Sequence, residues 1–574
     1  LLEDAHWIDP TSLDMFGRLV DRLRGLRALL VVTFRSEFVA PWLSRAHVTA
    51  LSLNRFGRRQ AVTMIDRITG GKALPSEVLD EIVAKTDGVP LFVEELTKTV
   101  IESGLIREES GAYVLAAALT PLAIPSTLQD SLMARLDRLA PVKEIAQIGA
   151  AIGREFSYRL LEAVAPIKGF ALQDALGQLM AAELLYARGA PPEASYIFKH
   201  ALVQDTAYVS LLRSRRQRIH ADIAKALEER FADQVEAAPA ILAHHYAEAG
   251  LAEPAARYWI KAAELALSRS ANAEADRYVE AGLALIPRLT DGPDRQSLEL
   301  ALHIAHANAL LPLKGFTATE MLAALTAAHR LIDAGVGSDF QRFAVLSRLC
   351  IVHSFTARME SALALARQAV EVAERQDDTT YRLVGYRLLG VVQFYTGRCR
   401  EGLESLEHAE RHRDPVRDKL LSFRFGADPG LYVVWGKMSA VALLGRLDQA
   451  RRAGEQVLSE LRSHGHTMTV AQGTFFAAVF LPFILRDFEA CERRSAELIA
   501  YCVEKKVEAI RIAAAIAQAF ARAMREPTRD AIAATRAAIE AQRRSGTQVF
   551  VSIYLSNLAE VLLMANDLAG AEAA

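Results

Sequence analysis

The sequence predicts a mainly α-helical protein that starts with part of an α/β core and ends in a long stack of helix pairs. In about the first hundred residues, short apolar runs alternate with segments of helical periodicity, the pattern of a parallel sheet covered by helices. From about residue 215 onward alanine is abundant, and helix pairs recur roughly every 35 to 45 residues, the spacing of helical-repeat solenoids.

Three strands are expected in the first part of the chain, at residues 1–2, 28–34 and 48–54. Each precedes a segment with helical periodicity, as the α/β pattern requires. After the first strand, Asp9 supplies a helix N-cap and Pro10 a first-turn proline, so a helix is expected to begin there. The carboxyl ends of these strands form the edge where ligands bind in an open parallel sheet.

Two acidic residues, Glu3 and Asp4, follow the first strand directly. A carboxylate pair in this place suits Mg²⁺-dependent phosphoryl transfer, in which one group holds the metal shell and another orients a water. Arg35 follows the next strand, so in a parallel sheet it lies beside the first strand's end, where a cation can contact a γ-phosphate. The alternative interpretations are a helix cap for the acids and, for Arg35, a surface ion pair with Glu37 or Glu3.

Residues 75–104 are expected to form two helices separated at Gly88-Val89-Pro90. Pro90 lacks a backbone donor and fixes a bend, which ends the first helix and starts the second. A plain helix-breaking turn is the alternative to a functional role for this segment.

A compact domain is expected next, with helical segments at 126–141, 143–153 and 172–185 followed by a hairpin around Pro191-Pro192. Three helices and a hairpin predict a winged helix. The two prolines suit the tip of the wing, because no ladder hydrogen bond is needed there.

The helical repeats are clearest at residues 386–412, where small residues occupy positions at which paired helices approach closely. The residues that follow the tetratricopeptide spacing are Leu389, Gly390, Gly397, Gly402, Leu406 and Ala409. Such a solenoid predicts a protein or peptide partner in its groove.

Composition excludes several classes of protein. A formal net charge of −2 gives no overall attraction to nucleic acid or to an anionic membrane, so neither is expected as a partner. The longest apolar runs are shorter than the roughly 20 residues that span a bilayer. Four cysteines at irregular spacing, without a CxxC pair, indicate a reducing compartment, and with no secretory signal pattern the expected location is the cytoplasm.

Both ends of the sequence predict a fragment of a larger protein. The chain begins without methionine inside the first apolar strand, and it stops at AGAEAA inside what should be the second helix of a repeat. A solenoid normally ends in a polar capping helix.

The opening segment, LLEDAHWIDPTSLDMFGRLVDRLRGLRALLVVTFRSEF, resembles the Walker B to sensor region of the signal-transduction ATPases with numerous domains (STAND). More narrowly, it is similar to bacterial proteins that join a class III adenylate/guanylate cyclase domain to such an AAA-like ATPase and a tetratricopeptide tail. The resemblance continues through DGVPLFVEEL, IPSTLQDSLMARLDRL, AAIGREFSY and YIFKHALVQDTAY, and it covers about the first 230 residues.

The resemblance implies roles for individual residues. Glu3 falls at the Mg-associated position, where Asp is the commoner residue, and Asp4 falls at the position that polarises water; both would hold Mg²⁺ through water in the complete parent. Arg35 falls at the sensor arginine, and Gly88 with Pro90 at the turn that lays the lid helices against the base of the nucleotide.

His200 resembles the histidine through which related death-regulator ATPases sense the β-phosphate. Ala201 stands where those relatives usually carry Asp, and a core or helix-start histidine is the alternative.

The sequence contains no G-x-x-x-x-G-K-[ST] loop, because Gly71-Lys72 precedes Ala73 and Gly436-Lys437 precedes Met438. That loop supplies most nucleotide affinity through its backbone N–H groups and lysine. ATP and Mg²⁺ are therefore expected as cofactors of the complete parent, while this chain alone should bind ATP poorly and be inactive.

Four domains are expected: residues 1–70 as the C-terminal part of the α/β ATPase core, 71–120 as a helical lid, 121–215 as the winged helix and 216–574 as a truncated solenoid. The predicted function is a regulatory ATP-binding switch in intracellular signalling, with a cyclase domain in cis in the parent. One alternative is a catalytically silent tetratricopeptide scaffold. Another is a transcription activator of the maltose-regulon type whose DNA-binding end is missing.

Overall fold

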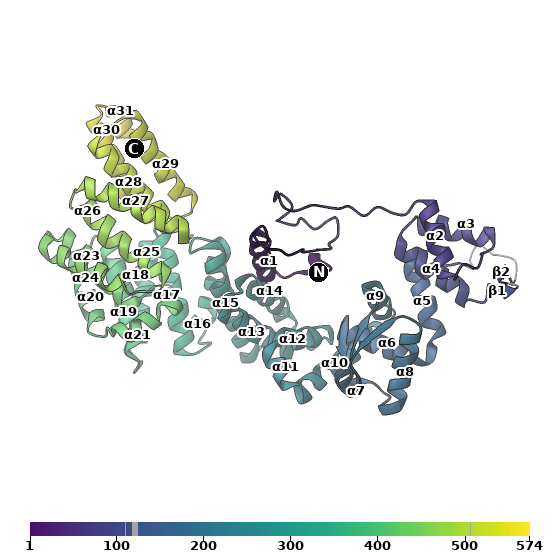
Figure 1. Cartoon of the computed structure of the whole chain (residues 1–574). Coiled ribbons are helices and arrows are strands. Elements are labelled where there is room, and N and C mark those ends of the chain that lie inside the picture. Colours follow the sequence, from purple (N-terminus) through teal and green to yellow (C-terminus); the bar gives the residue numbers. More distant parts are fainter. Residues whose placement is uncertain (110, 117–123, 426, 506) are drawn as a thin grey trace. The chain divides into compact units, whose positions relative to one another are not determined.

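The computed structural model describes residues 1–109, 111–116, 124–425, 427–505 and 507–574. The chain is mainly helical, as predicted, with short strands confined to its first 200 residues or so (Figure 1). It divides into two compact units, Leu1–Leu265 with Ala281–Leu289 and Ala266–Glu280 with Thr290–Ala574. Each unit is described separately.

The first unit opens with two short segments that meet in parallel at a single bridge, between Leu2 and Val32. A 3₁₀ turn η1 (Ala5–Trp7) and helix α1 (Pro10–Leu23) follow the first segment. The side chain of Asp9 accepts a hydrogen bond from the backbone N–H of Ser12 at 2.8 Å, so the predicted N-cap is present.

The strand predicted at 48–54 is wrong, because this segment is extended without any ladder partner. Val48 at its start is half-buried against the cluster that includes Trp42, but the leucines that follow face solvent, with Leu51 86% and Leu53 96% exposed. Alternation favours a strand only where a neighbour supplies hydrogen bonds and a second layer covers the apolar face. Neither is present at this segment in the described part of the unit.

A small helical module follows, with a core that includes Ile65, Ile82, Val93 and Leu96. The two helices predicted around residues 88–90 are present. An antiparallel hairpin was not predicted, since the region was expected to be mostly helical. The elements are α2 (Arg58–Ile68), α3 (Ser76–Thr86), α4 (Pro90–Glu102), β1 (Ile106–Glu109) and β2 (Ala112–Leu115).

Residues 124–213 contain the three expected helices and the expected hairpin, whose strands pair from Leu185 with Phe198 to Arg188 with Ser195. A further strand joins the hairpin, giving an antiparallel sheet in the order β3-β5-β4. The elements are α5 (Leu128–Arg138), α6 (Ala140–Ile152), β3 (Glu155–Ser157), α7 (Tyr158–Val164), α8 (Gly169–Ala181), β4 (Leu185–Arg188), β5 (Ser195–Phe198) and α9 (Ala201–Val209).

The remaining helices of the first unit share one hydrophobic core with this domain, through residues such as Ile223, Leu242 and Ala255. They are α10 (Arg213–Arg230), α11 (Ala232–Ala237), α12 (Pro239–Glu248) and most of α13 (Ala252–Ser268). Helix α14 (Asn272–Leu283) and η2 (Ile286–Arg288) complete the region in which the chain passes between the units.

The second unit is a stack of antiparallel helix pairs, and its described residues contain no strand. Its first helices are α15 (Pro293–Lys314), α16 (Thr319–Asp333), α17 (Asp339–Phe355), α18 (Met359–Glu374), α19 (Thr379–Tyr395), α20 (Cys399–Glu410), α21 (Pro415–Leu420) and α22 (Ser422–Phe425). The later ones are α23 (Pro429–Leu443), α24 (Leu447–Leu461), α25 (Thr467–Thr474), the π-helix η3 (Phe475–Phe480), α26 (Leu481–Ile484), α27 (Phe488–Lys505), α28 (Glu508–Arg525), α29 (Arg529–Arg544), α30 (Val551–Met564) and α31 (Leu568–Ala573).

The repeat spacing read from the sequence corresponds to close helix packing. A Cβ atom added to Gly390 of α19 would lie 2.8 Å from the carbonyl oxygen of Gly402 in α20, and one added to Gly402 would lie 2.8 Å from the carbonyl of Gly390. Gly397 has φ 77°, which suits glycine in the turn between the two helices. These positions hold the pair together as the tetratricopeptide spacing predicts.

One helix among the described residues, Thr467–Ile484, is long and apolar enough to cross a membrane by length and composition. Half of it is buried in the second unit, where Phe475 and Val479 belong to the hydrophobic core. A buried core helix satisfies the same criterion, so this helix is explained by packing.

Candidate functional site

The first two segments of the chain form the edge at which the acidic pair lies. The backbone N–H of Leu2 donates to the carbonyl of Val31 at 2.9 Å, and the N–H of Thr33 donates to the carbonyl of Leu2 at 2.9 Å. The N–H of Ala5 then donates to the carbonyl of Thr33 at 2.8 Å. The two segments are therefore parallel, and both present their carboxyl ends at one edge, as the sequence predicted.

Asp4 is held at this edge in a left-handed backbone conformation, with φ 54°. Its N–H donates to the Thr33 hydroxyl at 3.1 Å, and its side chain makes no capping hydrogen bond to η1. The carboxylate instead accepts a hydrogen bond from the Arg154 guanidinium at 2.8 Å, across 150 residues of sequence. The Asp4 side chain therefore does not act as a helix cap.

Arg154 stands immediately before β3, and its carbonyl accepts a hydrogen bond from the N–H of Phe198 at 3.0 Å, at the end of β5. This arginine was not identified as a functional residue from the sequence, although it lies within the AAIGREFSY segment that carries the resemblance. In the sequence, Arg154 is marked only by its position, as a single basic residue between the apolar helix α6 and the short strand β3.

Glu3 and Arg35 are less engaged than Asp4. Glu3 is exposed, and among the described residues the side chains of Glu3 and Arg35 make no hydrogen bond or ion pair, although the Arg35 carbonyl accepts a hydrogen bond from the N–H of Phe38 at 3.0 Å. Glu37, two residues beyond Arg35, has its pKa lowered by its backbone hydrogen bond, by Ser36 and by the charge of Arg35. The cation that contacts Asp4 comes from residue 154, and the sensor role of Arg35 stays a prediction.

The turn before α4 is fixed by close backbone contact. The N–H of Phe56 donates to the carbonyl of Gly88 at 2.7 Å. A Cβ atom on Gly88 would lie 2.1 Å from the carbonyl oxygen of Phe56, and φ at Gly88 is 69°, so only glycine fits. Pro90 then occupies the first turn of α4. Residues 88–90 therefore form a tight turn of fixed backbone conformation, which positions the amino end of α4.

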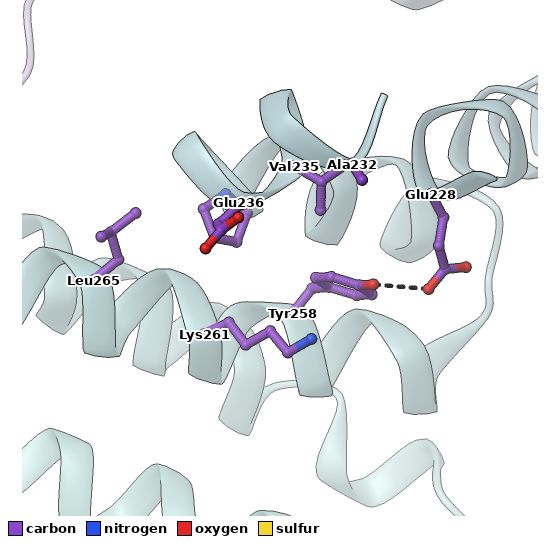
Figure 2. Close-up of a pocket in the computed structure, with 8 residues that line it drawn as sticks. Glu228, Ala232, Val235, Glu236, Tyr258, Lys261 and Leu265 are labelled. Atoms are coloured by element: carbon purple, nitrogen blue, oxygen red, sulfur yellow. Dashed lines mark hydrogen bonds between the residues drawn. The ribbon is translucent and has the colours of Figure 1, made fainter. Parts of the chain in front are cut away.

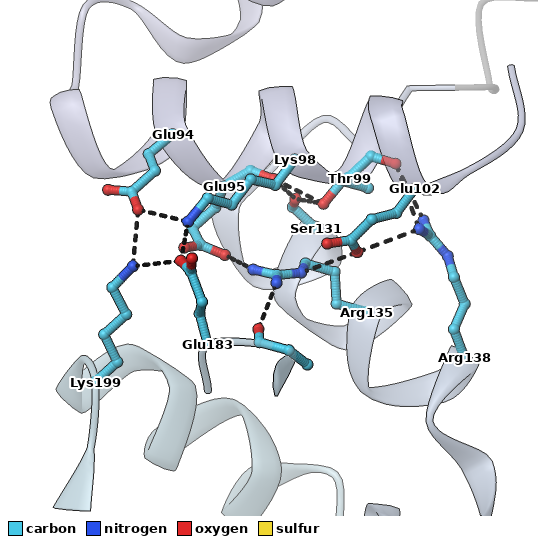
Figure 3. Close-up of polar contacts among 11 residues, drawn as sticks. Glu94, Glu95, Lys98, Thr99, Glu102, Ser131, Arg135, Arg138, Glu183 and Lys199 are labelled. Atoms are coloured by element: carbon cyan, nitrogen blue, oxygen red, sulfur yellow. Dashed lines mark hydrogen bonds and ion pairs between the residues drawn. The ribbon is translucent and has the colours of Figure 1, made fainter. Parts of the chain in front are cut away.

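A buried ion pair lies beneath α4 (Figure 3). The guanidinium of Arg135 on α5 pairs with Glu95 on α4, and these side chains are only 3% and 2% exposed. The same guanidinium donates to Glu102 at 3.2 Å and to the carbonyl of Ala182 at 2.7 Å. Because each partner satisfies the other's charge, this pair joins α4 firmly to α5.

A second group of charges borders the first, also shown in Figure 3. Lys199 donates to Glu94 at 2.8 Å and to Glu183 at 3.1 Å, and Lys98 donates to Glu94 at 2.8 Å and also pairs with Glu183. Hydrogen bonds from Lys98 and Lys199 lower the pKa of Glu183 to about 2. Helix α4 is thus tied to the segment that follows β5.

His200 comes next in the chain and begins α9 without making a capping hydrogen bond. Its Nε2 atom is buried and has no partner within the described part of the chain. Burial and the charge of Lys199 lower the pKa of this histidine. The structure therefore places His200 beside the α4 charges, two residues beyond the strand end that contacts Arg154.

Neither glycine–lysine pair of the sequence forms a phosphate loop. Lys72 pairs with Glu108 at 2.6 Å, and Lys437 lies within helix α23, where it pairs with Glu410. The edge that carries Glu3 and Asp4 thus offers carboxylate ligands that suit a metal. This sequence, however, does not supply the glycine-rich loop whose backbone N–H groups bind the phosphates.

The described residues contain no group of three or more His, Cys, Asp or Glu side chains that could hold a metal ion. His220 and His245 do meet in the first unit, with their Nδ1 atoms 2.8 Å apart, and the Tyr208 hydroxyl lies 2.9 Å from Nε2 of His220. Burial lowers the pKa of His220 to about 4 and that of His245 to about 3. These are neutral core histidines.

A cavity of about 440 Å³ lies between α10, α11, α12 and α13 (Figure 2). Glu228 within it accepts hydrogen bonds from the hydroxyls of Tyr246 and Tyr258, the latter at 2.7 Å, and these bonds lower its pKa. The ammonium of Lys261 lies 4.5 Å from the centre of the Tyr258 ring. Glu228 and Lys261 thus have partners within the protein, and the cavity is lined by residues other than Glu3 and Asp4.

No model of a known protein family matches the chain. An uncharacterized protein of Rhizobium meliloti (strain 1021) is 25% identical over 578 residues, which cover 99% of this chain and 55% of the relative. The chain therefore spans about half the length of the curated relative it matches.

Two solved structures are similar in part. One is a STAND protein with a tetratricopeptide repeat sensor from Pyrococcus horikoshii, with a TM-score of 0.43, 14% identity, and coverage of 98% of this chain and 77% of that protein. The other is the Rap protein complexed with competence and sporulation factor, with a TM-score of 0.40, 8% identity, and coverage of 56% and 95%.

Proposed function

We propose that this chain is part of a regulatory ATP-binding switch of the STAND kind that acts in signal transduction in the cytoplasm. The observation that carries the proposal is the Asp4 carboxylate at the edge of the parallel pair, bonded to Arg154 instead of to the adjacent turn. A carboxylate in that place is available both to a nucleotide-bound metal and to the domain of residues 121–215, which carries Arg154. Because the metal and Arg154 would compete for the Asp4 carboxylate, nucleotide binding at this edge would change the position of that domain.

The strength of this ion pair suits a switch. The side chains of Arg154 and Asp4 are 42% and 41% exposed, and an ion pair of that exposure contributes at most about 1 kcal/mol. A ligand that binds the open edge better than the paired edge needs only a small differential affinity to release Arg154. Breaking a buried pair such as Arg135 with Glu95 would cost several times more free energy than breaking the Asp4–Arg154 pair.

The buried pair has a different role in the proposal. Because α4 is tied to α5 through Arg135, and to the end of β5 through Lys199, the lid and the domain of residues 121–215 are expected to move together. We propose that this domain is a winged helix, and that the turn at Gly88 and Pro90 with His200 brings it against the nucleotide. Glu3 and Arg35 are proposed to act at the same edge as Asp4.

ATP with Mg²⁺ is the ligand that the proposal requires, and when bound it would supply the phosphoryl group. The residues of this chain would then hold the metal's water shell, through Asp4 and Glu3, and orient the attacking water. The phosphate loop is proposed to lie upstream in a longer protein, together with a cyclase domain in cis. The solenoid of residues 216–574 is proposed to bind a protein or peptide partner.

The longer protein provides the test of this function. Binding of a fluorescent ATP analogue would be compared for the wild type, for Arg35→Ala, and for Arg18→Ala as the control. Arg18 is an exposed arginine on α1 that pairs with Asp14 at 2.6 Å. The proposal predicts that Arg35→Ala weakens binding by about tenfold or more, since a charge-assisted hydrogen bond to phosphate is lost, and that the control changes nothing. Equal affinity for all three proteins, or no binding by the wild type, would favour a silent scaffold.

A further inference from the structure

Arg387 is buried in the second unit without a partner for its charge. Its residue is 6% exposed, and its Nε atom is buried and makes no hydrogen bond within the described ranges of the chain. Arginine stays protonated in proteins, even though burial lowers the pKa of this guanidinium. A buried charge without a counter-ion costs several kcal/mol, so this residue is not explained by stability.

The groups that surround Arg387 are neutral. The guanidinium lies over the ring of Tyr432, 4.6 Å from its centre. Burial raises the pKa of the Cys350 thiol to about 12 and that of the Tyr395 hydroxyl well above its usual value, so both stay protonated near neutral pH. None of these neighbours balances the charge.

A second unpartnered donor belongs to a ring that contacts Tyr432. The ring of Trp435 is 4.7 Å from that of Tyr432 and is fully buried, and its Nε1 atom has no acceptor among the described residues. Trp435 also stacks on Phe476 at 5.7 Å, which fixes the indole in place. Two buried donors joined through Tyr432 therefore lack acceptors, whereas buried donors are normally satisfied.

The segment Ser545–Phe550, which connects α29 to α30, contacts the cluster at Tyr395. Its backbone is bound to the ends of distant helices: the N–H of Gln548 donates to the carbonyl of Phe355 at 2.7 Å. The Phe550 ring meets that of Tyr395 at 5.0 Å. Phe550 has φ 65°, a left-handed conformation that costs a non-glycine residue roughly 1–2 kcal/mol.

We propose that Arg387 is the binding residue for a carboxylate group of an effector, which enters the second unit beside Tyr432 when the segment Ser545–Phe550 moves away. A carboxylate fits because a single planar guanidinium binds it through two parallel hydrogen bonds. A phosphate dianion fits less well, because the described residues of this cluster provide only one cation, Arg387. The carboxylate can belong to a small free acid or to an acidic side chain of a peptide.

Binding at Arg387 is independent of the nucleotide edge, but its role as an effector site rests on the proposed function. A partner that carries a carboxylate would bind only the open form of the segment, and would shift the second unit by its differential affinity for that form. The tests therefore use the chain alone and contain no nucleotide. Their failure would overturn this site and leave the ATP-binding proposal standing.

The first experiment measures the melting temperature of the chain while sodium acetate replaces sodium chloride at constant ionic strength. We expect acetate to raise the melting temperature of the wild type. In Arg387→Met the apparent affinity for acetate should fall by at least about tenfold, since hydrogen bonds to a charged group are lost. Arg382→Met is the matched control, because Arg382 lies on the same helix and is paired with Glu374 at 3.5 Å; it should respond as the wild type does.

Two further variants keep the test decisive if Arg387→Met folds poorly. Arg387→Lys retains the charge but cannot bind a carboxylate through two parallel bonds, so it should respond to acetate more weakly than the wild type. Phe550→Ala should respond more strongly, because the closing segment no longer has to be displaced.

A hexaglutamate peptide distinguishes the two sources. If it acts at a lower carboxylate concentration than acetate does, the ligand is a peptide; if acetate acts and the peptide does not, it is a small acid. Equal responses of the wild type and Arg387→Met, or no response of the wild type to either probe, would overturn the proposal and indicate that ordered water satisfies Arg387.

Discussion

Replacing Arg135 with methionine removes one half of the buried ion pair between α5 and α4. It leaves the Glu95 carboxylate 2% exposed and without its cation. Breaking a buried pair in this way costs about 3–5 kcal/mol, since one charge stays uncompensated. The lower figure corresponds to roughly a hundredfold increase in local opening. We therefore expect amide hydrogens of α4 to exchange about a hundred times faster in Arg135→Met.

Hydrogen exchange followed by mass spectrometry is the suitable assay, because a chain with two units does not unfold in one two-state step. Glu102→Gln is the control: its side chain is 42% exposed, so its loss should cost less than about 1 kcal/mol. The double variant Glu95→Met with Arg135→Met should recover most of the protection, because no charge is left buried. A less than tenfold effect of Arg135→Met, or a double variant that exchanges faster than the single one, would refute the reasoning.

Three other predictions concern the backbone and the pH. Gly88→Ala should destabilise the first unit by at least about 2 kcal/mol in urea unfolding, because the new methyl group meets the Phe56 carbonyl in a left-handed turn; unchanged stability would show that this turn can move. Gly390→Ala should cost about 1–3 kcal/mol through overpacking against the next helix, and an unchanged melting temperature of the second unit would contradict that. His220 and His245 have folded pKa values of about 4 and 3, below the unfolded value, so their contribution is complete above pH 6.5 and is lost as the pH falls through 4. Calorimetry between pH 7 and 4 should show a loss of a few kcal/mol in the first unit, which is smaller in His245→Gln, and equal losses would contradict this account.

The local features of the fold were predictable because their causes lie within a few residues. Asp9 caps α1 through a bond to a residue three positions away, and Gly88 with Pro90 fixes a turn by backbone shape. The glycines of the clearest repeat were found for the same reason, because Gly390 and Gly402 lie at spacings that a helix pair requires.

The sequence was less informative where the cause lies far along the chain. The short apolar run at 48–54 predicted a strand, but no described segment pairs with it and its leucines face solvent. The hairpin of β1 and β2 was missed, although Gly104, which precedes β1, and Gly111, which directly precedes β2, both adopt the left-handed conformation. Its four-residue strands are too short for alternation to distinguish them from a loop.

The residues that matter most for the proposals depend on tertiary contacts. Arg154 reaches Asp4 across 150 residues, and nothing in the local pattern separates it from other surface arginines. Arg135 lies within a segment that was quoted for its resemblance, yet its pairing with Glu95 depends on the crossing of two helices. Arg387 was not noticed because a buried arginine without a partner is identified only once its surroundings are known.

The central claim is that the Asp4 carboxylate faces a nucleotide at the edge of the parallel pair. Single-turnover hydrolysis of ATP by the longer protein tests it most directly, with Asp4→Asn compared with Asp14→Asn, an exposed carboxylate on α1. We expect Asp4→Asn to bind ATP within a few-fold of the wild type but to hydrolyse it about a hundredfold or more slowly, and Asp14→Asn to match the wild type. An Asp4→Asn protein that hydrolyses ATP at the wild-type rate would contradict the account.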